Sequence, residues 1–255
     1  MNSMHLANQK WWDAASANWA RGADSRGLWP RCPTEPELAL CPKALAYFED
    51  ATGKRVCVLG SGDNQVVFAL AGLGVAVTSV DISQKQLDVA ARRAKELGLS
   101  ISFQQADVTD LSAFANDAFD SVYTGGHVAV WVSDLQMYYS EAVRILRPGG
   151  FFIVDEYHPF RRLWKNSRDA LVVENPYFER GPFEYEESAA ILQPEPGPWK
   201  TYEFHWTVSD YMNAVLKTGC SLELVDEYGE DVEREGAPLH GLPEFLLIVG
   251  QKPVR

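Results

Sequence analysis

Residues 56–62 read Val-Cys-Val-Leu-Gly-Ser-Gly, an apolar run that ends in two glycines separated by one residue. Nineteen residues beyond Gly62, a second apolar run over 75–80 ends in Asp81. The glycines of such a turn let backbone N–H groups approach a ligand closely, and a carboxylate after the next strand accepts hydrogen bonds from ribose hydroxyls. The stretch therefore predicts a strand, a tight turn, a helix and a second strand around a nucleotide-type pocket.

Composition and charge limit the class of protein and its partners. The chain has 255 residues, of which 46% are hydrophobic and 23% charged, as expected of one α/β domain with a full core. The net charge of −12 opposes the approach of DNA or RNA, which requires a basic surface. The four cysteines form no C-x-x-C pair, and the chain has neither a signal-peptide core nor a long apolar run. We therefore expect a cytoplasmic protein with no metal site, no nucleic-acid partner and no membrane span.

From residue 55 onward, segments typical of strands alternate with segments typical of helices. Apolar runs predict strands at 55–60, 75–81, 101–106, 119–124 and 151–157. Capping residues and apolar spacing predict helices at 5–20, 36–50, 64–72, 83–97, 133–146 and 209–218. Two last strands, at 221–228 and 244–251, are expected to form a terminal hairpin. The series predicts a Rossmann-like, doubly wound α/β fold with a seven-stranded, mostly parallel sheet.

Several helix boundaries follow from single residues. Ser83 is the expected N-cap of the helix at 83–97, and either Ser133 or Asp134 caps the helix at 133–146. Pro36 suits the first turn of the helix at 36–50. The residues 147–150, Arg-Pro-Gly-Gly, are expected to turn sharply from a helix into the fifth strand.

Two regions fall outside the alternating series, although the whole chain, 1–255, is expected to be a single domain. Residues 1–53 are predicted to be an N-terminal helical cap. Residues 158–206 form an insertion after the fifth strand that is rich in proline and aromatic residues. So long a stretch without clear helical period suggests an acceptor lid. The alternative is that its aromatics are simply the core of a small subdomain.

The glycine turn alone does not identify the cofactor. The dinucleotide fingerprint requires G-x-G-x-x-G/A, and Gln65 stands at the third small position. Taken alone, the turn leaves NAD and S-adenosylmethionine equally open. Asp107 follows the third strand, where its carboxylate either accepts an adenine amino hydrogen or serves as a local cap. The terminal hairpin stands in place of a second dinucleotide half, which favours S-adenosylmethionine.

In this order and spacing, five motifs resemble those of the class I S-adenosylmethionine-dependent methyltransferases, most of all the small-molecule branch. The motifs are V-L-G-S-G (58–62), V-D-I-S (80–83), Q-A-D-V (105–108), F-D-S-V-Y (119–123) and L-R-P-G-G (146–150). The resemblance covers 40–157 by motif and 208–251 by element order. It implies the same doubly wound fold, with S-adenosyl-L-methionine as cofactor.

The resemblance assigns the cofactor a set of residues by position: Trp19, Gly60, Ser61, Gly62, Asp81, Ile82, Asp107, Val108, Thr124 and Gly125. The glycine turn would lie along the methionine, Asp81 would bind the ribose, Ile82 would pack on adenine, and Asp107 would accept the adenine amino hydrogen. Thr124 and Gly125 would border the sulfonium. Two of these assignments have open points. Trp12 or Trp19 would touch the cofactor or only pack the helix on the sheet. The family's acidic residue before the glycine loop is missing, and Asp63 is a possible substitute.

Methyl transfer is an in-line displacement, and a hydroxyl or protonated amine acceptor adds the need for a base. His127 follows the fourth strand and His158 follows the fifth, so both are expected at the sheet edge where ligands bind. These histidines are the catalytic candidates. The alternative is that His127 only covers the cofactor and that His158 makes a turn with the next proline.

The sequence therefore predicts an enzyme that transfers a methyl group from S-adenosyl-L-methionine to a small-molecule acceptor. Two other functions stay open: an NAD-dependent oxidoreductase and a non-catalytic S-adenosylmethionine-binding protein. We expect a monomer or weak homodimer that binds neither nucleic acid nor membrane. The acceptor itself is not readable from the sequence.

Overall fold

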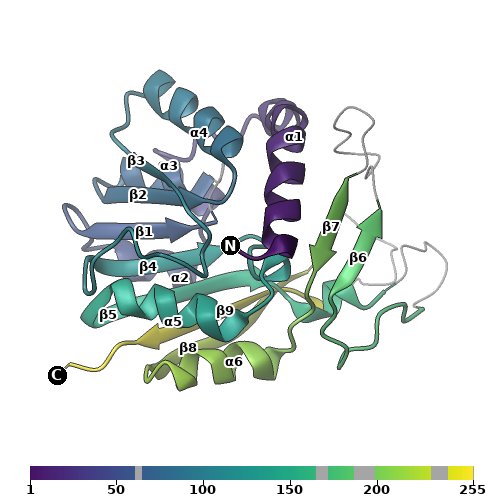
Figure 1. The fold of residues 1–255 in the computed structure, drawn as a ribbon. Helices are drawn as coiled ribbons and strands as arrows, with labels where there is room; N and C mark the ends of the chain where they lie inside the picture. Colours follow the sequence, from purple (N-terminus) through teal and green to yellow (C-terminus); the bar gives the residue numbers. More distant parts are fainter. Residues whose placement is uncertain (61–64, 165–171, 187–198, 231–240, 255) are drawn as a thin grey trace.

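The computed structural model describes residues 1–60, 65–164, 172–186, 199–230 and 241–254 (Figure 1). A seven-stranded sheet forms its centre, with the strand order β3-β2-β1-β4-β5-β9-β8. Its strands are β1 (Arg55–Leu59), β2 (Ala76–Asp81), β3 (Ser102–Gln105), β4 (Phe119–Gly125), β5 (Leu146–Tyr157), β8 (Ser221–Glu230) and β9 (Pro243–Gln251). The helices are α1 (Ser3–Arg26), α2 (Pro42–Leu45), α3 (Gln65–Gly72), α4 (Gln84–Glu96), α5 (Leu135–Ile145) and α6 (Val208–Lys217). In the described residues, no helix is long and apolar enough to cross a bilayer.

The five strands β1–β5 pair in parallel, and β9 is antiparallel to both β5 and β8. The predicted seven-stranded, mostly parallel sheet and the terminal hairpin are thereby confirmed. A dinucleotide fold would continue the parallel series beyond the fifth strand. The hairpin replaces that continuation.

Both faces of the sheet are buried because strand side chains alternate in direction. In β1, Cys57 and Leu59 face one hydrophobic cluster together with α5 and α6. Val56 and Val58 face the other cluster, to which α3 and α4 contribute. This explains the continuous apolar run of β1, which is typical of a parallel strand covered on both sides.

Helix α1 stands at the carboxyl ends of the parallel strands, between the main sheet and a separate two-stranded sheet (Figure 1). That second sheet pairs β6 (Phe183–Glu186) with β7 (Lys200–Glu203) in antiparallel fashion. Asn2 caps the start of α1, and Gly27 ends it in a left-handed conformation at φ +63°. These caps make the helix longer than the predicted 5–20.

Other boundaries were predicted with mixed success. Ser83 caps α4 as predicted. Of the two candidate caps of α5, Ser133 and Asp134, it is Asp134 that forms the cap. The helix predicted at 36–50 is wrong: the segment forms short turns, η1 (Pro36–Leu38), α2 and η2 (Ala46–Phe48). Pro42 explains the break, since proline lacks an N–H and keeps the preceding residue extended. The residues 147–150 are not a separate turn but belong to β5, whose register against β4 shifts there.

Candidate functional site

A pocket opens at the carboxyl ends of β1, β2 and β4, beneath α1. It is lined by His5, Asn8, Trp12, Trp19, Gly60, Asp81, Ile82, Gln86, Asp107, Val108, Gly126, His127, Val128, Trp131 and Val132. The pocket and its mouth, with the open solvent in them, span about 910 Å³ of space between atoms. Trp19, Gly60, Asp81, Ile82, Asp107, Val108 and His127 are thus brought together as lining residues.

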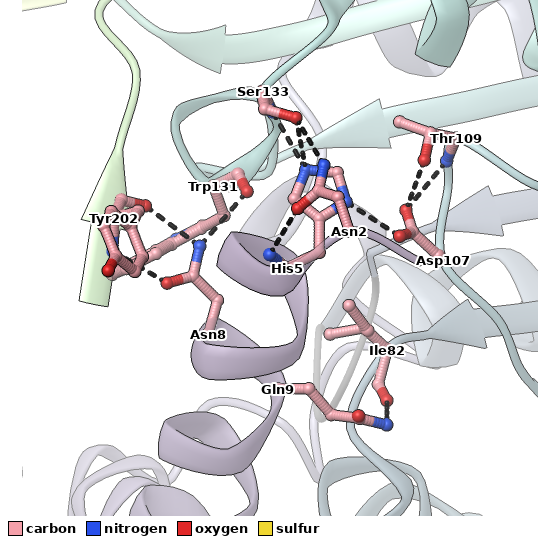
Figure 2. Close-up of polar contacts among 10 residues, drawn as sticks. All are labelled: Asn2, His5, Asn8, Gln9, Ile82, Asp107, Thr109, Trp131, Ser133 and Tyr202. Carbon is pink, nitrogen blue, oxygen red and sulfur yellow. Dashed lines mark hydrogen bonds and ion pairs between the residues drawn. The ribbon is translucent and has the colours of Figure 1, made fainter. Parts of the chain in front are cut away.

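Asp81 and Ile82 form the end of β2 and the turn into α4. The Ser83 backbone N–H donates to Asp81 Oδ1 at 2.8 Å, which fixes the carboxylate at the pocket wall. The Ile82 carbonyl accepts hydrogen bonds from the Gln9 side chain of α1 and from Gln105. The turn is therefore held from two sides, and Figure 2 shows the bond from Gln9.

Asp107 is almost fully buried, and each of its oxygens has a separate partner. Oδ1 accepts from the Thr109 backbone N–H at 3.0 Å and from its hydroxyl at 2.8 Å. Oδ2 lies 2.7 Å from His5 Nδ1 (Figure 2). Burial works to raise the pKa of Asp107, but the bonds from His5 and Thr109 outweigh it, and the pKa lies below its ordinary value. The group is therefore a carboxylate at neutral pH.

Gly60 ends β1 with φ +64° and packs closely against the loop that follows β4. A Cβ placed on Gly60 would lie 2.4 Å from Val128 Cγ2, which is too close for any side chain. Glycine is thus required here both by the backbone angle and by the neighbour. Ser61, Gly62 and Asp63, the rest of the predicted glycine turn, lie outside the described residues.

Tryptophans form one wall of the pocket. Trp12 meets both Trp19 and Trp131 edge to face, with ring centroids 5.7 and 5.4 Å apart. Trp12, Trp19 and Trp131 all line the pocket. Of the tryptophans of α1, Trp12 and Trp19 thus both pack on each other and face the cavity.

Thr124 and Gly125 are buried behind the residues that line the pocket. The Thr124 hydroxyl is buried and hydrogen-bonded to Tyr138, and a Cβ on Gly125 would meet the Asp155 carbonyl oxygen at 2.4 Å. Neither residue lines the pocket; Gly126 and His127, which follow them, do.

The loop from Gly126 to Ala129 is held by a buried carboxylate. Glu156 accepts the backbone N–H of His127 at 2.9 Å and that of Ala129 at 3.1 Å. Burial is the main cause that raises the pKa of Glu156 to about 7. His127 itself adopts φ +97°, a backbone angle that is rare outside glycine and costs energy.

The His127 ring lies between the pocket and a chain of polar groups. Its Nε2 is contacted by the Arg162 guanidinium, and Arg162 lies 3.4 Å from Glu203. Burial, together with the charges of Arg162 and Arg161, lowers the pKa of His127 well below its ordinary value. His127 is therefore a neutral imidazole at pH 7. Arg162 belongs to η4 (Pro159–Arg162).

His158 and His205 lie outside the pocket lining. His158 Nε2 lies 2.7 Å from Glu227, and its Nδ1 accepts from the Phe160 backbone at the start of η4. The His205 ring stacks on Phe183, with ring centroids 4.1 Å apart. Of the predicted lid at 158–206, residues 165–171 and 187–198 lie outside the described residues.

The sequence reasoning missed several lining residues, among them two on α1. His5 and Asn8 were not considered, although with Trp12 and Trp19 they recur at helical spacing along one face. That periodicity was the available signal. Gln86, Gly126, Val128, Trp131 and Val132 carry no comparable pattern.

Comparison with known proteins agrees with this arrangement. Residues 57–154 match the family model described as a methyltransferase domain. A ubiquinone biosynthesis O-methyltransferase from Caulobacter sp. (strain K31) is 35% identical over 119 residues, which are 44% of this chain and 47% of the relative. A ubiquinone/menaquinone biosynthesis C-methyltransferase UbiE from Bdellovibrio bacteriovorus is 36% identical over 118 residues, 45% of this chain and 49% of the relative. The chain thus spans about half the length of the curated relatives it matches.

Among solved structures, an S-adenosylmethionine-dependent methyltransferase from Mesorhizobium loti has the same fold. Its TM-score is 0.63 at 24% identity, over 83% of this chain and 96% of that one. Residues 57–154 thus match a methyltransferase domain. The chain as a whole has the fold of that solved S-adenosylmethionine-dependent methyltransferase.

Proposed function

We propose that the protein transfers a methyl group from S-adenosyl-L-methionine to a small-molecule acceptor. The observation that carries the proposal is the convergence of Asp81, Ile82, Asp107 and Gly60 in one pocket beneath α1. Two carboxylates at neighbouring strand ends fit the ribose hydroxyls and the adenine amino group, all of which are hydrogen-bond donors. The close approach of Gly60 to Val128 fits a backbone wall along the methionine part.

The sulfonium of the cofactor supplies the methyl group. For such a displacement the protein must align the acceptor and exclude water, which is worth on the order of 7–11 kcal/mol in favourable cases. Helix α1 and Trp131 cover the pocket from solvent. Trp12 and Trp131 line the pocket, and indole rings attract positive charge through their quadrupole, which suits a sulfonium.

We propose that His127 is the base. Its neutral state and its place on the pocket wall support this role. Its Nε2 is engaged by Arg162, so it can accept a proton only after Arg162 turns to its second partner, Glu203, 3.4 Å away. His158, the other catalytic candidate, would act indirectly. It caps η4, the turn that carries Arg162.

The cap at 1–53 and the lid at 158–206 are part of the proposal. Three of the cap's residues contact strand-end turns that line the pocket: His5, Gln9 and Asp13. The acceptor is proposed to be a small organic molecule because the relatives are named for ubiquinone biosynthesis and because the net charge of −12 opposes nucleic acid. A cytoplasmic monomer or weak homodimer, without nucleic-acid or membrane partners, completes the proposal.

Calorimetry with the purified protein tests the cofactor. We expect S-adenosylmethionine and its demethylated product to bind, NAD not to bind, and Asp81→Ala to weaken both sulfur ligands. Binding of NAD alone would overturn the proposal. Turnover is then tested with labelled methyl donor and a metabolite extract. Cofactor binding without any methylated product would favour the non-catalytic binding protein.

A further inference from the structure

His5 connects two elements of the pocket that are far apart in the sequence. From α1 its ring reaches Asp107 after β3 and Ser133 after β4, across 102 and 128 residues (Figure 2). The ring is only 2% exposed and lines the pocket. Other α1 contacts, such as Asn8 with Trp131 and Tyr202, hold the helix but do not reach Asp107.

The hydrogen bonds fix the direction of this connection. The Ser133 backbone N–H can only donate, and it lies 2.9 Å from His5 Nε2, so that nitrogen carries no proton. The neutral ring therefore has its proton on Nδ1, 2.7 Å from Asp107 Oδ2. The Ser133 hydroxyl also lies within 3.1 Å of Nε2. His5 thus donates to Asp107 and keeps it an acceptor.

The carboxylate of Asp107 has a limited number of acceptor positions, about four in all. Thr109 uses two on Oδ1 and His5 uses one on Oδ2. Among the described residues, His5 is the hydrogen-bond partner of Oδ2, so that one acceptor position of Oδ2 is left, and Asp107 lines the pocket. Oδ1 therefore holds the local turn, whereas Oδ2 is the oxygen that can contact a ligand. A group bound at Oδ2 has to be a hydrogen-bond donor, because the carboxylate oxygen only accepts.

We propose that His5 is a specificity-determining residue, which selects an adenine base with its 6-amino donor over a base with a carbonyl at that position. This inference rests on the proposed use of S-adenosylmethionine. Without the His5 donor, the desolvated carboxyl takes up a proton more readily. A protonated Asp107 can donate to a carbonyl, so the preference for an amino group decreases.

The test compares S-adenosylhomocysteine with S-inosylhomocysteine, in which a carbonyl replaces the 6-amino group, by calorimetry. We expect the wild-type protein to prefer the adenosyl compound by at least about tenfold. In His5→Phe, which keeps a ring of similar size, this ratio should decrease about fivefold or more. His5→Asn, whose amide can replace the Nδ1–H donor, should restore most of the ratio.

Asp13→Ala is the matched control for helix docking, since Asp13 ties α1 to Ser83 and Lys85 without contacting Asp107. Asp13→Ala should lower the affinity for both compounds by the same factor. If His5→Phe does the same, His5 only docks the helix and the inference is overturned. A wild-type ratio near one overturns it without any variant. If the wild-type protein binds neither compound, the proposed function fails as well.

Discussion

The proposed adenosine end and the proposed acceptor end of the pocket are built in different ways. At the adenosine end, Asp81 and Asp107 lie at the ends of neighbouring parallel strands, and each is held by a residue two positions further along the chain. At the acceptor end, His127 depends on Glu156, Arg162 and Glu203, which come from β5, η4 and β7. At the first end, local bonds set the turns and His5 of α1 adds one long-range contact to Asp107. At the second end, every one of these contacts joins segments that are distant in the sequence.

The largest effect is expected on kcat, for a substitution at the acceptor end. His127→Asn should lower kcat by about 100-fold or more, because a base contributes roughly 100- to 10,000-fold. Asparagine tolerates positive φ, so the backbone of the loop is preserved. Cofactor affinity should change little, as measured by calorimetry beside turnover of an acceptor found in the extract.

The matched control is His158→Asn, at the other catalytic candidate. Since His158 lies outside the pocket lining and pairs with Glu227, its loss should reduce kcat much less. Equal losses in the two variants would contradict a base role for His127.

At the adenosine end, Asp81→Ala should weaken cofactor binding by about 100-fold, or 2.7 kcal/mol, since it removes charged hydrogen bonds to the ribose. Calorimetry measures this directly. Asp88→Ala, on the exposed side of α4, removes a carboxylate that accepts a hydrogen bond from Gln84 and does not line the pocket, so it should leave the affinity unchanged. A similar loss in both variants would mean that net charge, not the ribose contact, sets the affinity.

Gly60 packs against Val128, and Gly60→Ala tests this contact. The new Cβ would overlap Val128 and stand at φ +64°, so the free energy of unfolding should decrease by about 2–4 kcal/mol. Gly98→Ala has nearly the same angle, φ +68°, with no neighbour within 4 Å, and isolates the backbone cost. Chemical denaturation compares them. If Gly60→Ala and Gly98→Ala lose the same free energy of unfolding, the overlap with Val128 is unimportant. If Val128→Ala restores the stability of Gly60→Ala, that overlap is the cause of the loss.

The smallest effect concerns the pH dependence of stability. The pKa of Glu156 in the folded protein is about 7, above its ordinary 4.5, because the group is buried. Between these pH values the folded state binds more protons than the unfolded state, so the free energy of unfolding falls as the pH rises. The stabilisation is complete only below about pH 4.5.

Glu156→Gln removes this titration and should flatten the pH dependence between about pH 4.5 and 7. Chemical denaturation at several pH values measures the slope. Asp155, whose pKa is raised to about 6 by burial, titrates in both proteins and serves as the internal reference. An unchanged slope would show that Glu156 does not titrate in this range.

Much of the fold was predictable because it depends on local pattern. Apolar runs ending in Gly60 and Asp81 gave the strands, and Ser83 gave a helix start, since both signals act within a few residues. The helix at 36–50 failed because Pro42 outweighed the apolar spacing. Ile82 and Val108 were predicted for the pocket and line it, whereas His158 was placed at the correct sheet edge but does not line the pocket.

By itself, the sequence determined the parallel sheet, the terminal hairpin and the carboxylates at the ends of β2 and β3. Each depends on side-chain alternation and on neighbours close in the chain. Only the tertiary structure decided that His5 lies against Asp107 and that Arg162 lies against His127. Those contacts join segments that meet only when α1 and η4 pack at the sheet edge, and no local pattern encodes where two distant segments meet.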